Sequence, residues 1–391
     1  MNKRDWTYKK LSEVCHPKKD IKRASKHYKS DDYISYIDIS SIDNKNNVIT
    51  ETTRYAFCDA PSRAQQIVCS DDVIISMVRP NLKNIAMVRE GSNLVASSGF
   101  CVLRSRPAVN PSFLFSFVKS TRFTNYLISR VSGANYPAVR ESDILNFSIP
   151  LPSMEEQEAI VAELDEINEV IAALQQQVAD LDTLAQSTFY DMFGDPVTNP
   201  NGWDVKKLGS LCTIERGGSP RPIKDFITEA EDGINWIKIG DAKEGSIFID
   251  STAEKIKPEG MKKSRFVRKG DFILSNSMSF GRPYILRVDG CIHDGWLVIR
   301  DDNHIFDKYF LFYFLSSQNV YKEFKRLAVG GVVNNLNSSM VRALNVFVPP
   351  ITTQQEFANK VEAIESAKVE LSAQITEMQN LLASRMDYFF D

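Results

Sequence analysis

The chain has 391 residues and a formal net charge of −3, a length that indicates two or three domains, each able to bury its own core. It contains no run of 18 apolar residues, and its first residues lack the apolar stretch of a signal peptide, so we expect a cytoplasmic protein without a membrane-spanning helix. Its six cysteines never occur as C-x-x-C and its four histidines are scattered, which argues against a zinc site and a disulfide framework and favours free, mostly buried thiols.

A segment near the start of the chain is repeated near its middle. The segment WTYKKLSEVC starts at Trp6, and WDVKKLGSLC starts at Trp203. The shared Trp, Leu and Cys residues are each 197 positions apart, which indicates an internal duplication. The duplication predicts four segments, namely a first globular domain (1–152), a spacer helix (153–193), a linker with a second globular domain (194–350) and a second spacer helix (351–391).

The charge is distributed unevenly among these segments. The two long segments are basic, with a net charge of +8 over 1–152 and +4 over 201–350. The two short segments are acidic, with −11 over 153–200 and −4 over 351–391. A phosphate-binding surface is therefore compatible with the acidic total.

Both globular domains show the same order of expected elements, strands first and then a long helix. The first domain has expected strands at 33–39, 71–78, 84–88 and 100–104 and a helix at 111–130. The second has expected strands at 234–240, 270–277, 284–288 and 295–300 and a helix at 307–324. This pattern predicts an α/β or α+β fold that occurs twice, with loops that differ between the copies.

The two acidic segments have the heptad spacing of long helices. Capping patterns start them, Ser153 with Glu156 in the first and Thr352 with Gln355 in the second. Lys368 and Arg385 interrupt the second seam, either as devices that fix the register or as exposed residues at a loose point. The seams consist of Ile160, Leu164, Ile167, Ile171, Leu174, Val178, Leu181 and Ala185, and of Phe357, Val361, Ile364, Leu371, Ile375, Met378 and Leu382.

Two helices of equal length with matching seams on one chain are expected to pack on each other rather than separately on their own domains. The first helix leads from the first domain to the second. If the second helix leaves the second domain in the equivalent way, a two-fold relation makes the helices antiparallel. The sequence therefore predicts an antiparallel coiled coil and a pseudo-two-fold, circular arrangement with the chain ends near each other.

The common motifs of catalysis and cofactor binding are absent from the sequence. It lacks G-x-G-x-x-G after a strand, the P-loop, G-x-S-x-G and H-E-x-x-H. The Gly-rich RGGSPRP at 216–222 lacks the Lys-Ser/Thr ending of a P-loop and is interpreted as a turn. We therefore expect no catalytic residue, no metal and no bound cofactor.

Basic and polar loops remain, and two of them occur in both copies. The segments 78–84 and 276–283 form one pair, and 132–140 and 329–337 form the other. Arg and Asn in such loops can pair with guanine and adenine edges, while the Lys-rich segment 18–29 is a possible phosphate contact or simply a solvated surface. The candidate DNA-binding residues are Lys18, Lys19, Lys22, Arg23, Arg79, Asn81, Lys83, Tyr136, Arg140, Arg216, Arg221, Asn276, Arg282, Asn334 and Asn335.

The sequence resembles a known family in several segments at once. These are MFGDPVTNPNGW after the first heptad helix, RGGSPRP, INWIKIGDAKEG, and the two pre-helical segments IPLPSMEEQEAI and FVPPITTQQEF. Together they resemble the DNA-specificity subunit of type I restriction-modification systems, and the resemblance covers essentially the whole chain.

The resemblance implies two target-recognition domains that read the halves of a split sequence in double-stranded DNA, held apart by the two helices. It implies a subunit without catalytic activity that recruits two methyltransferase subunits and further restriction subunits. S-adenosylmethionine, ATP and Mg would then belong to those partners. Among the candidates, Arg79, Asn81, Tyr136, Asn276 and Arg282 would contact base edges.

Three other functions fit parts of the pattern. A specificity subunit of another restriction class would share the fold but serve a different enzyme. A two-domain scaffold that binds peptides would show no salt-dependent affinity for DNA. A nuclease with an unfamiliar motif would cleave DNA in the presence of a divalent metal.

Overall fold

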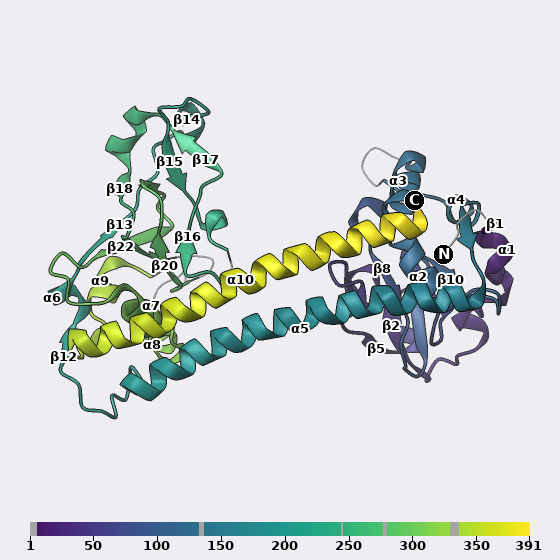
Figure 1. Ribbon diagram of the computed structural model, residues 1–391, viewed down its shortest axis with the longest axis horizontal. Helices are drawn as coiled ribbons and strands as arrows, with labels where there is room; N and C mark the ends of the chain where they lie inside the picture. Colours follow the sequence, from purple (N-terminus) through teal and green to yellow (C-terminus); the bar gives the residue numbers. More distant parts are fainter. Residues whose placement is uncertain (1–5, 133–136, 244, 277–279, 329–335) are drawn as a thin grey trace. The chain divides into compact units, whose positions relative to one another are not determined.

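The structure, a computed structural model, describes residues 6–132, 137–243, 245–276, 280–328 and 336–391 (Figure 1). Its residues divide into two compact units. Unit 1 comprises Met1–Gln175 and Ala373–Asp391, and unit 2 comprises Gln176–Ser372. Each unit therefore combines one globular part with segments of both long helices, α5 (Met154–Phe193) and α10 (Ile351–Phe390).

Unit 1 contains two main sheets. Three antiparallel strands have the order β10-β7-β8, and four strands have the order β5-β2-β9-β6, in which β2 and β9 are parallel. Strand β1 pairs with β11, and β3 pairs with β4. The bounds are β1 Thr7–Lys10, β2 Tyr33–Ile37, β3 Ile42–Asp43, β4 Val48–Ile49, β5 Thr53–Ala56, β6 Ala64–Ile67, β7 Val73–Ser76, β8 Ile85–Met87, β9 Leu94–Ser97, β10 Phe100–Leu103, β11 Ser148–Leu151, α1 Leu11–Val14, α2 Pro111–Val118, α3 Thr121–Arg130 and α4 Glu141–Leu145.

Unit 2 repeats this topology with two strands added to the three-stranded sheet and one added to the four-stranded sheet. Its sheets have the orders β13-β22-β19-β20-β16 and β14-β17-β15-β21-β18, and β15 and β21 are parallel, as β2 and β9 are in unit 1. Strand β12 pairs with β23. The bounds are β12 Val205–Lys207, β13 Thr213–Arg216, β14 Ile227–Thr228, β15 Ile234–Ile237, β16 Phe248–Ile249, β17 Glu254–Ile256, β18 Arg265–Val267, β19 Phe272–Ser275, β20 Pro283–Leu286, β21 Gly290–Ile292, β22 Trp296–Arg300, β23 Asn345–Phe347, α6 Leu208–Leu211, α7 Lys308–Ser316, α8 Gln318–Ala328 and α9 Ser338–Arg342.

The eight expected strands are confirmed, but the single helix predicted in each copy is wrong. Each is split into two, α2 and α3 in unit 1 and α7 and α8 in unit 2. The break follows from a serine in extended conformation. Ser120 accepts a hydrogen bond from Phe123 N and caps α3, and the hydroxyl of Ser317 accepts one from Val320 N at the start of α8.

The core of unit 1 combines its globular part with the start of α5 and the end of α10. Ile160 and Leu164 of α5 and Phe389 and Phe390 of α10 belong to the same buried cluster as Phe113 of α2. The rings of Phe113 and Phe390 are 5.4 Å apart in a T-shaped arrangement. The last turn of the chain is therefore part of unit 1 (Figure 1).

The core of unit 2 uses the two helices in the reverse roles. Phe357 and Val361 lie near the start of α10, Phe189 and Phe193 lie near the end of α5, and all four belong to the same buried cluster as Phe310 of α7. The rings of Phe193 and Phe310 are 4.9 Å apart, again T-shaped. In each unit, the end of one long helix thus packs on an equivalent helix of the globular part, α2 in unit 1 and α7 in unit 2.

A buried glutamine fixes each long helix to its own globular part. The side chain of Gln157 accepts a hydrogen bond from Asn110 N at 2.8 Å and donates to Ala108 O and Pro152 O, both at 3.1 Å. Gln354, which lies 197 positions later and is equally buried, makes the equivalent three bonds in unit 2. Buried polar side chains are retained only when hydrogen-bonded, so these residues define where the helix leaves the domain.

Of the two predicted helix starts, the first is confirmed and the second is wrong. The reciprocal capping bonds between Ser153 and Glu156 are present at the start of α5. The prediction for Thr352 and Gln355 is wrong, because α10 already begins at Ile351 and both residues lie inside it. Pro350 occupies the position that corresponds to Ser153, and it has no side-chain oxygen or N–H for a reciprocal cap.

The two polar residues in the second seam form ion pairs within their units. In unit 2, Lys368 Nζ lies 2.6 Å from Asp182 of α5 and 2.9 Å from Glu365. Burial lowers the pKa of Lys368, but the hydrogen bonds to these two carboxylates outweigh burial, and its pKa lies above the usual value. In unit 1, Arg385 binds both carboxylate oxygens of Glu163. These contacts favour the interpretation as register devices over simple exposure.

The remaining seam positions are also withdrawn from solvent. Ile160, Leu164, Ile167 and Ile171 are buried in α5, as are Phe357, Val361 and Ile364 in α10, whereas Leu174, Val178, Leu181, Leu371, Ile375, Met378 and Leu382 are partly buried. The cysteines are free, and four of the six are buried, as predicted. Among the described residues, no helix combines the length and apolarity that a membrane crossing requires.

Candidate functional site

In unit 1, the structure brings two of the candidate loops together. Arg79 follows β7, and its backbone N donates to Pro137 O at 2.8 Å, while Val139 N donates to Met77 O at 2.9 Å. Arg79 adopts a left-handed conformation with φ of 50°, which is unusual for a residue other than glycine, and its side chain is exposed. The loop 78–84 is therefore held against residues 137–139, whereas Tyr136 lies outside the described residues.

The other candidates of loop 78–84 differ in accessibility. Asn81 lies exposed in the short 3-10 turn Pro80–Leu82. Lys83 is partly buried, and its Nζ donates to Lys119 O at 3.1 Å. Asn81 is thus available to a ligand, whereas the ammonium group of Lys83 already has a partner inside unit 1.

The basic segment near the start of the chain lies beside the second of these loops. Lys18 forms an ion pair with Glu141, the first residue of α4. Arg140 directly precedes Glu141 and is exposed, and its backbone N donates to Asp143 at 2.9 Å. The remaining candidates of the segment, Lys19, Lys22 and Arg23, are exposed.

The predicted equivalence of the loops in the two copies is confirmed by a shared backbone contact. In unit 2, Leu336 N donates to Asn276 O at 3.0 Å, as Val139 N donates to Met77 O in unit 1. The loop after β19 thus meets the segment before α9, as the loop after β7 meets the segment before α4. Asn334 and Asn335 lie outside the described residues.

Asn276 has a structural contact that the sequence did not reveal. It is 2% exposed, and its Nδ2 donates to Asp294 O at 2.9 Å. Its side-chain amide therefore joins two loops of unit 2. Arg282, at the other end of its loop, is exposed at the rim of a cavity of about 630 Å³ that Phe280, Tyr284 and Tyr321 help to line.

Two further candidates, Arg216 and Arg221, and one unpredicted residue, Ser219, meet at Asp294 in the loop between β21 and β22. Arg216 Nε donates to Asp294 O at 3.0 Å, Ser219 Oγ donates to its Oδ1 at 2.6 Å, and Arg221 lies 3.5 Å from its Oδ2. Both arginines are exposed. Ser219 and Asp294 were not among the predicted residues, because a His-Asp-Gly sequence before a strand resembles an ordinary turn.

The glycine pair of RGGSPRP permits this meeting. A Cβ atom on Gly217 would lie 2.2 Å from His293 O, and one on Gly218 would lie 3.0 Å from Lys263 O. Side chains at these positions would collide with fixed backbone atoms. The interpretation as a turn is thus refined, because the glycines let the Arg216 loop pass between two other segments of unit 2.

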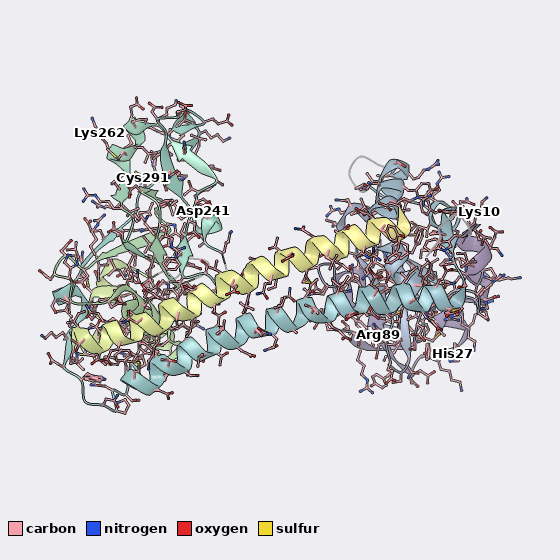
Figure 2. All side chains as sticks on the ribbon, viewed as in Figure 1. Lys10, His27, Arg89, Asp241, Lys262 and Cys291 are labelled. Carbon is pink, nitrogen blue, oxygen red and sulfur yellow. The ribbon has the colours of Figure 1, made fainter. Side chains whose placement is uncertain are left out.

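One basic segment of unit 2 was not among the predicted DNA-binding segments. It contains seven Lys and Arg residues between Lys255 and Lys269 with one intervening acid, Glu259. The equivalent strands of unit 1 span 53–67 and contain only two. A comparison limited to features shared by both copies therefore does not reveal this basic segment. Lys262 and Lys263 are exposed, and Figure 2 shows Lys262 at the outer edge of unit 2.

The sequence pattern of the family described as type I restriction modification DNA specificity domain matches this chain twice, at residues 3–181 and 200–378. The chain is 21% identical over 392 residues to the type I restriction enzyme StySPI specificity subunit of Salmonella potsdam, covering 93% of this chain and 83% of that one. It is 23% identical over 325 residues to the MjaVIII specificity subunit of Methanocaldococcus jannaschii, covering 77% and 73%.

Solved structures show the same relationship. A chain from a study of complex assembly and conformational transition in a type I restriction-modification system matches with a TM-score of 0.65 and 27% identity, covering 98% of this chain and 97% of that chain. The S subunit of a type I system from M. genitalium shares the fold, with a TM-score of 0.51 and 12% identity, covering 99% and 96%.

Each family match spans one globular part together with the first portion of the long helix that follows it. The two matches together include most of the chain. It therefore belongs to the type I restriction-modification DNA specificity family, as a specificity subunit with two copies of the family's domain.

Proposed function

We propose that this specificity subunit reads a split sequence in double-stranded DNA, with unit 1 reading one half-site and unit 2 the other. The observation that carries this proposal is the repeated loop scaffold. Basic loops follow equivalent strands in the two units and are held by an equivalent backbone contact, yet their sequences differ. A duplicated scaffold with divergent loops suits two related readers of different half-sites.

We further propose that α5 and α10 form an antiparallel coiled coil that sets the gap between the half-sites, in a circular, pseudo-two-fold chain. Two observations support this. The start of α5 and the end of α10 share the core of unit 1, whereas the end of α5 and the start of α10 share that of unit 2. The ion pairs of Arg385 with Glu163 and of Lys368 with Asp182 have the same reversed order.

The exposed candidate residues fall into two classes, those that contact DNA phosphates and those that contact base edges. Lys19, Lys22, Lys262 and Lys263 bind phosphates, because they are exposed and lie in basic segments. Of the predicted base-edge candidates, Arg79, Asn81 and Arg282 have exposed side chains, and we add Arg216 and Arg221, which are exposed as well. Asn276 has a supporting role, given its burial and its bond to Asp294 O.

The chemistry of the system resides on partner subunits in this proposal. The acidic outer faces of the helices dock two methyltransferase subunits, which bind S-adenosylmethionine, and restriction subunits supply ATP- and Mg-dependent steps. The specificity subunit itself is not catalytic. Because the assembly acts on genomic DNA, we propose that it works in the cytoplasm.

Co-expression with the methyltransferase subunits, followed by mapping of N6-methyladenine in host DNA, tests the proposal. We expect one motif of two short half-sites separated by a fixed gap. Replacing residues 201–350 by those of a relative should change one half-site and leave the other and the gap unchanged. Methylation without a split motif, or a swap that changes both half-sites, would contradict the two-reader scheme.

A further inference from the structure

We propose that Asp294 is a positioning residue that sets the base preference of unit 2 by holding Arg216 and Arg221 in one orientation. This inference rests on the proposed function, because it assigns those arginines to the half-site of unit 2. It adds a determinant of specificity that reaches DNA through other residues.

The contacts of Asp294 join three loops of unit 2. Its backbone O accepts hydrogen bonds from Arg216 Nε at 3.0 Å and from Asn276 Nδ2 at 2.9 Å. Its carboxylate accepts from Ser219 Oγ at 2.6 Å and lies 3.5 Å from Arg221. One residue thus connects both arginines of the glycine-rich loop with the loop after β19.

The carboxylate is charged at neutral pH. The hydrogen bond from Ser219 lowers the pKa of Asp294, partial burial opposes this effect, and the nearby His293 and Arg221 lower it further. The resulting pKa lies below its usual value. The negative charge attracts the guanidinium group of Arg221, while Ser219 fixes the direction of the carboxylate.

This arrangement contributes little to folding, because it is open to solvent. The side chain of Arg221 is 79% exposed and that of Asp294 is 45% exposed. Ion pairs with this exposure add little stability. The same exposure leaves the arginines accessible to a DNA groove, where a fixed orientation favours bidentate pairing with guanine.

The arrangement is absent from the described part of unit 1. The strand β10 begins at Phe100 after Ser-Ser-Gly, and β22 begins at Trp296 after His-Asp-Gly, so Ser98 occupies the position of Asp294. Ser98 N donates to Arg63 O at 2.8 Å. A residue that makes the two units prefer different bases is expected to differ between equivalent positions of their shared scaffold, as Asp294 and Ser98 do.

The test compares Asp294→Asn with Asp250→Asn in the complete complex with its methyltransferase subunits. The Asp294→Asn variant keeps an oxygen that can accept from Ser219 and removes the charge that faces Arg221. Asp250→Asn removes an equal charge from an exposed ion pair with Arg287 elsewhere in unit 2. Competition binding with oligonucleotides substituted at each position of both half-sites gives the base preferences, and thermal melting reports the fold.

For Asp294→Asn we expect discrimination at one or two positions of the unit 2 half-site to fall by about fivefold or more, as for a weakened base contact. Preferences at the other half-site, the salt dependence of binding and the melting temperature should be unchanged, because no phosphate contact or core residue is altered. Asp294→Glu, which restores the charge, should recover part of the discrimination. Asp250→Asn should behave as the wild type.

Two outcomes would overturn the inference. One is an unchanged preference in Asp294→Asn. The other is a uniform loss of affinity on all sequences with a lower melting temperature, which would assign Asp294 to the fold alone. Failure of the proposed function would be recognised separately, because the wild-type complex itself would then show no split preference.

Discussion

The hydrogen bonds of Gln354 give a stability prediction that can be worked out from three distances. Its Oε1 accepts from Asp307 N at 2.8 Å, and its Nε2 donates to Pro349 O at 2.9 Å and to Ile305 O at 3.2 Å. Gln354 is fully buried. The substitution Gln354→Leu nearly preserves the volume and leaves these three backbone groups without their partner.

Each buried polar group that loses its partner costs about 1–3 kcal/mol, so even the lower bound summed over three groups gives about 3 kcal/mol of unfolding free energy. Urea unfolding of the purified chain, followed by tryptophan fluorescence, suits the measurement because Trp203, Trp236 and Trp296 all lie in unit 2. The control is Gln355→Leu at the exposed neighbouring position, which should change the free energy by less than about 0.5 kcal/mol. A value for Gln354→Leu as small as that of the control would refute the argument that this residue fixes α10.

Three further predictions concern unit 2. Replacing Lys262 and Lys263 by Gln should reduce the slope of log affinity against log salt concentration by about 2, because two phosphate contacts are lost. The slope is measured on both specific and unrelated DNA. An unchanged slope would show that neither lysine contacts DNA. Gly217→Ala should cost about 2 kcal/mol or more, measured by thermal melting, because its Cβ would lie 2.2 Å from His293 O, and a melting temperature equal to that of the wild type would contradict the close approach. Burial lowers the pKa of His293, so between this lowered pKa and about 6.5 the unfolded chain binds more protons at this ring than the folded protein does. The free energy of unfolding should therefore fall as the pH drops through about 6.5, and His293→Gln should flatten this dependence, whereas identical pH profiles would show that the ring is not held neutral.

The features that the sequence predicted best are those that follow from a regular spacing of residues along the chain. The heptad spacing from Ile160 onward reflects the periodicity of a helix, and it identified both long helices and their inward faces. The 197-residue period located the equivalent strands because duplicated scaffolds keep their core residues. It also paired the loops after β7 and β19, which the backbone contacts of Met77 and Asn276 confirm.

Features that depend on contacts between distant segments were not predictable. Asp294 acquires its role only because Gly217 and Gly218 let a loop 75 residues away approach it. The split of each predicted helix depends on a single serine, Ser120 or Ser317, whose polar neighbours are equally compatible with a continuous amphipathic helix. The second capping pattern failed because Thr352 is already the second residue of α10, so Thr352 and Gln355 match the motif by chance.

The packing of Phe389 and Phe390 in the core of unit 1 determines the order in which the chain can fold during synthesis. Unit 2 ends at Ser372, whereas unit 1 is incomplete until residues 373–391 have been synthesised. The globular part of unit 1 is synthesised first, yet the apolar surface around Phe113 and Phe117 stays uncovered until Phe390 has left the ribosome. A truncation of only the last turn should thus expose the oldest part of the nascent chain to aggregation and to proteases.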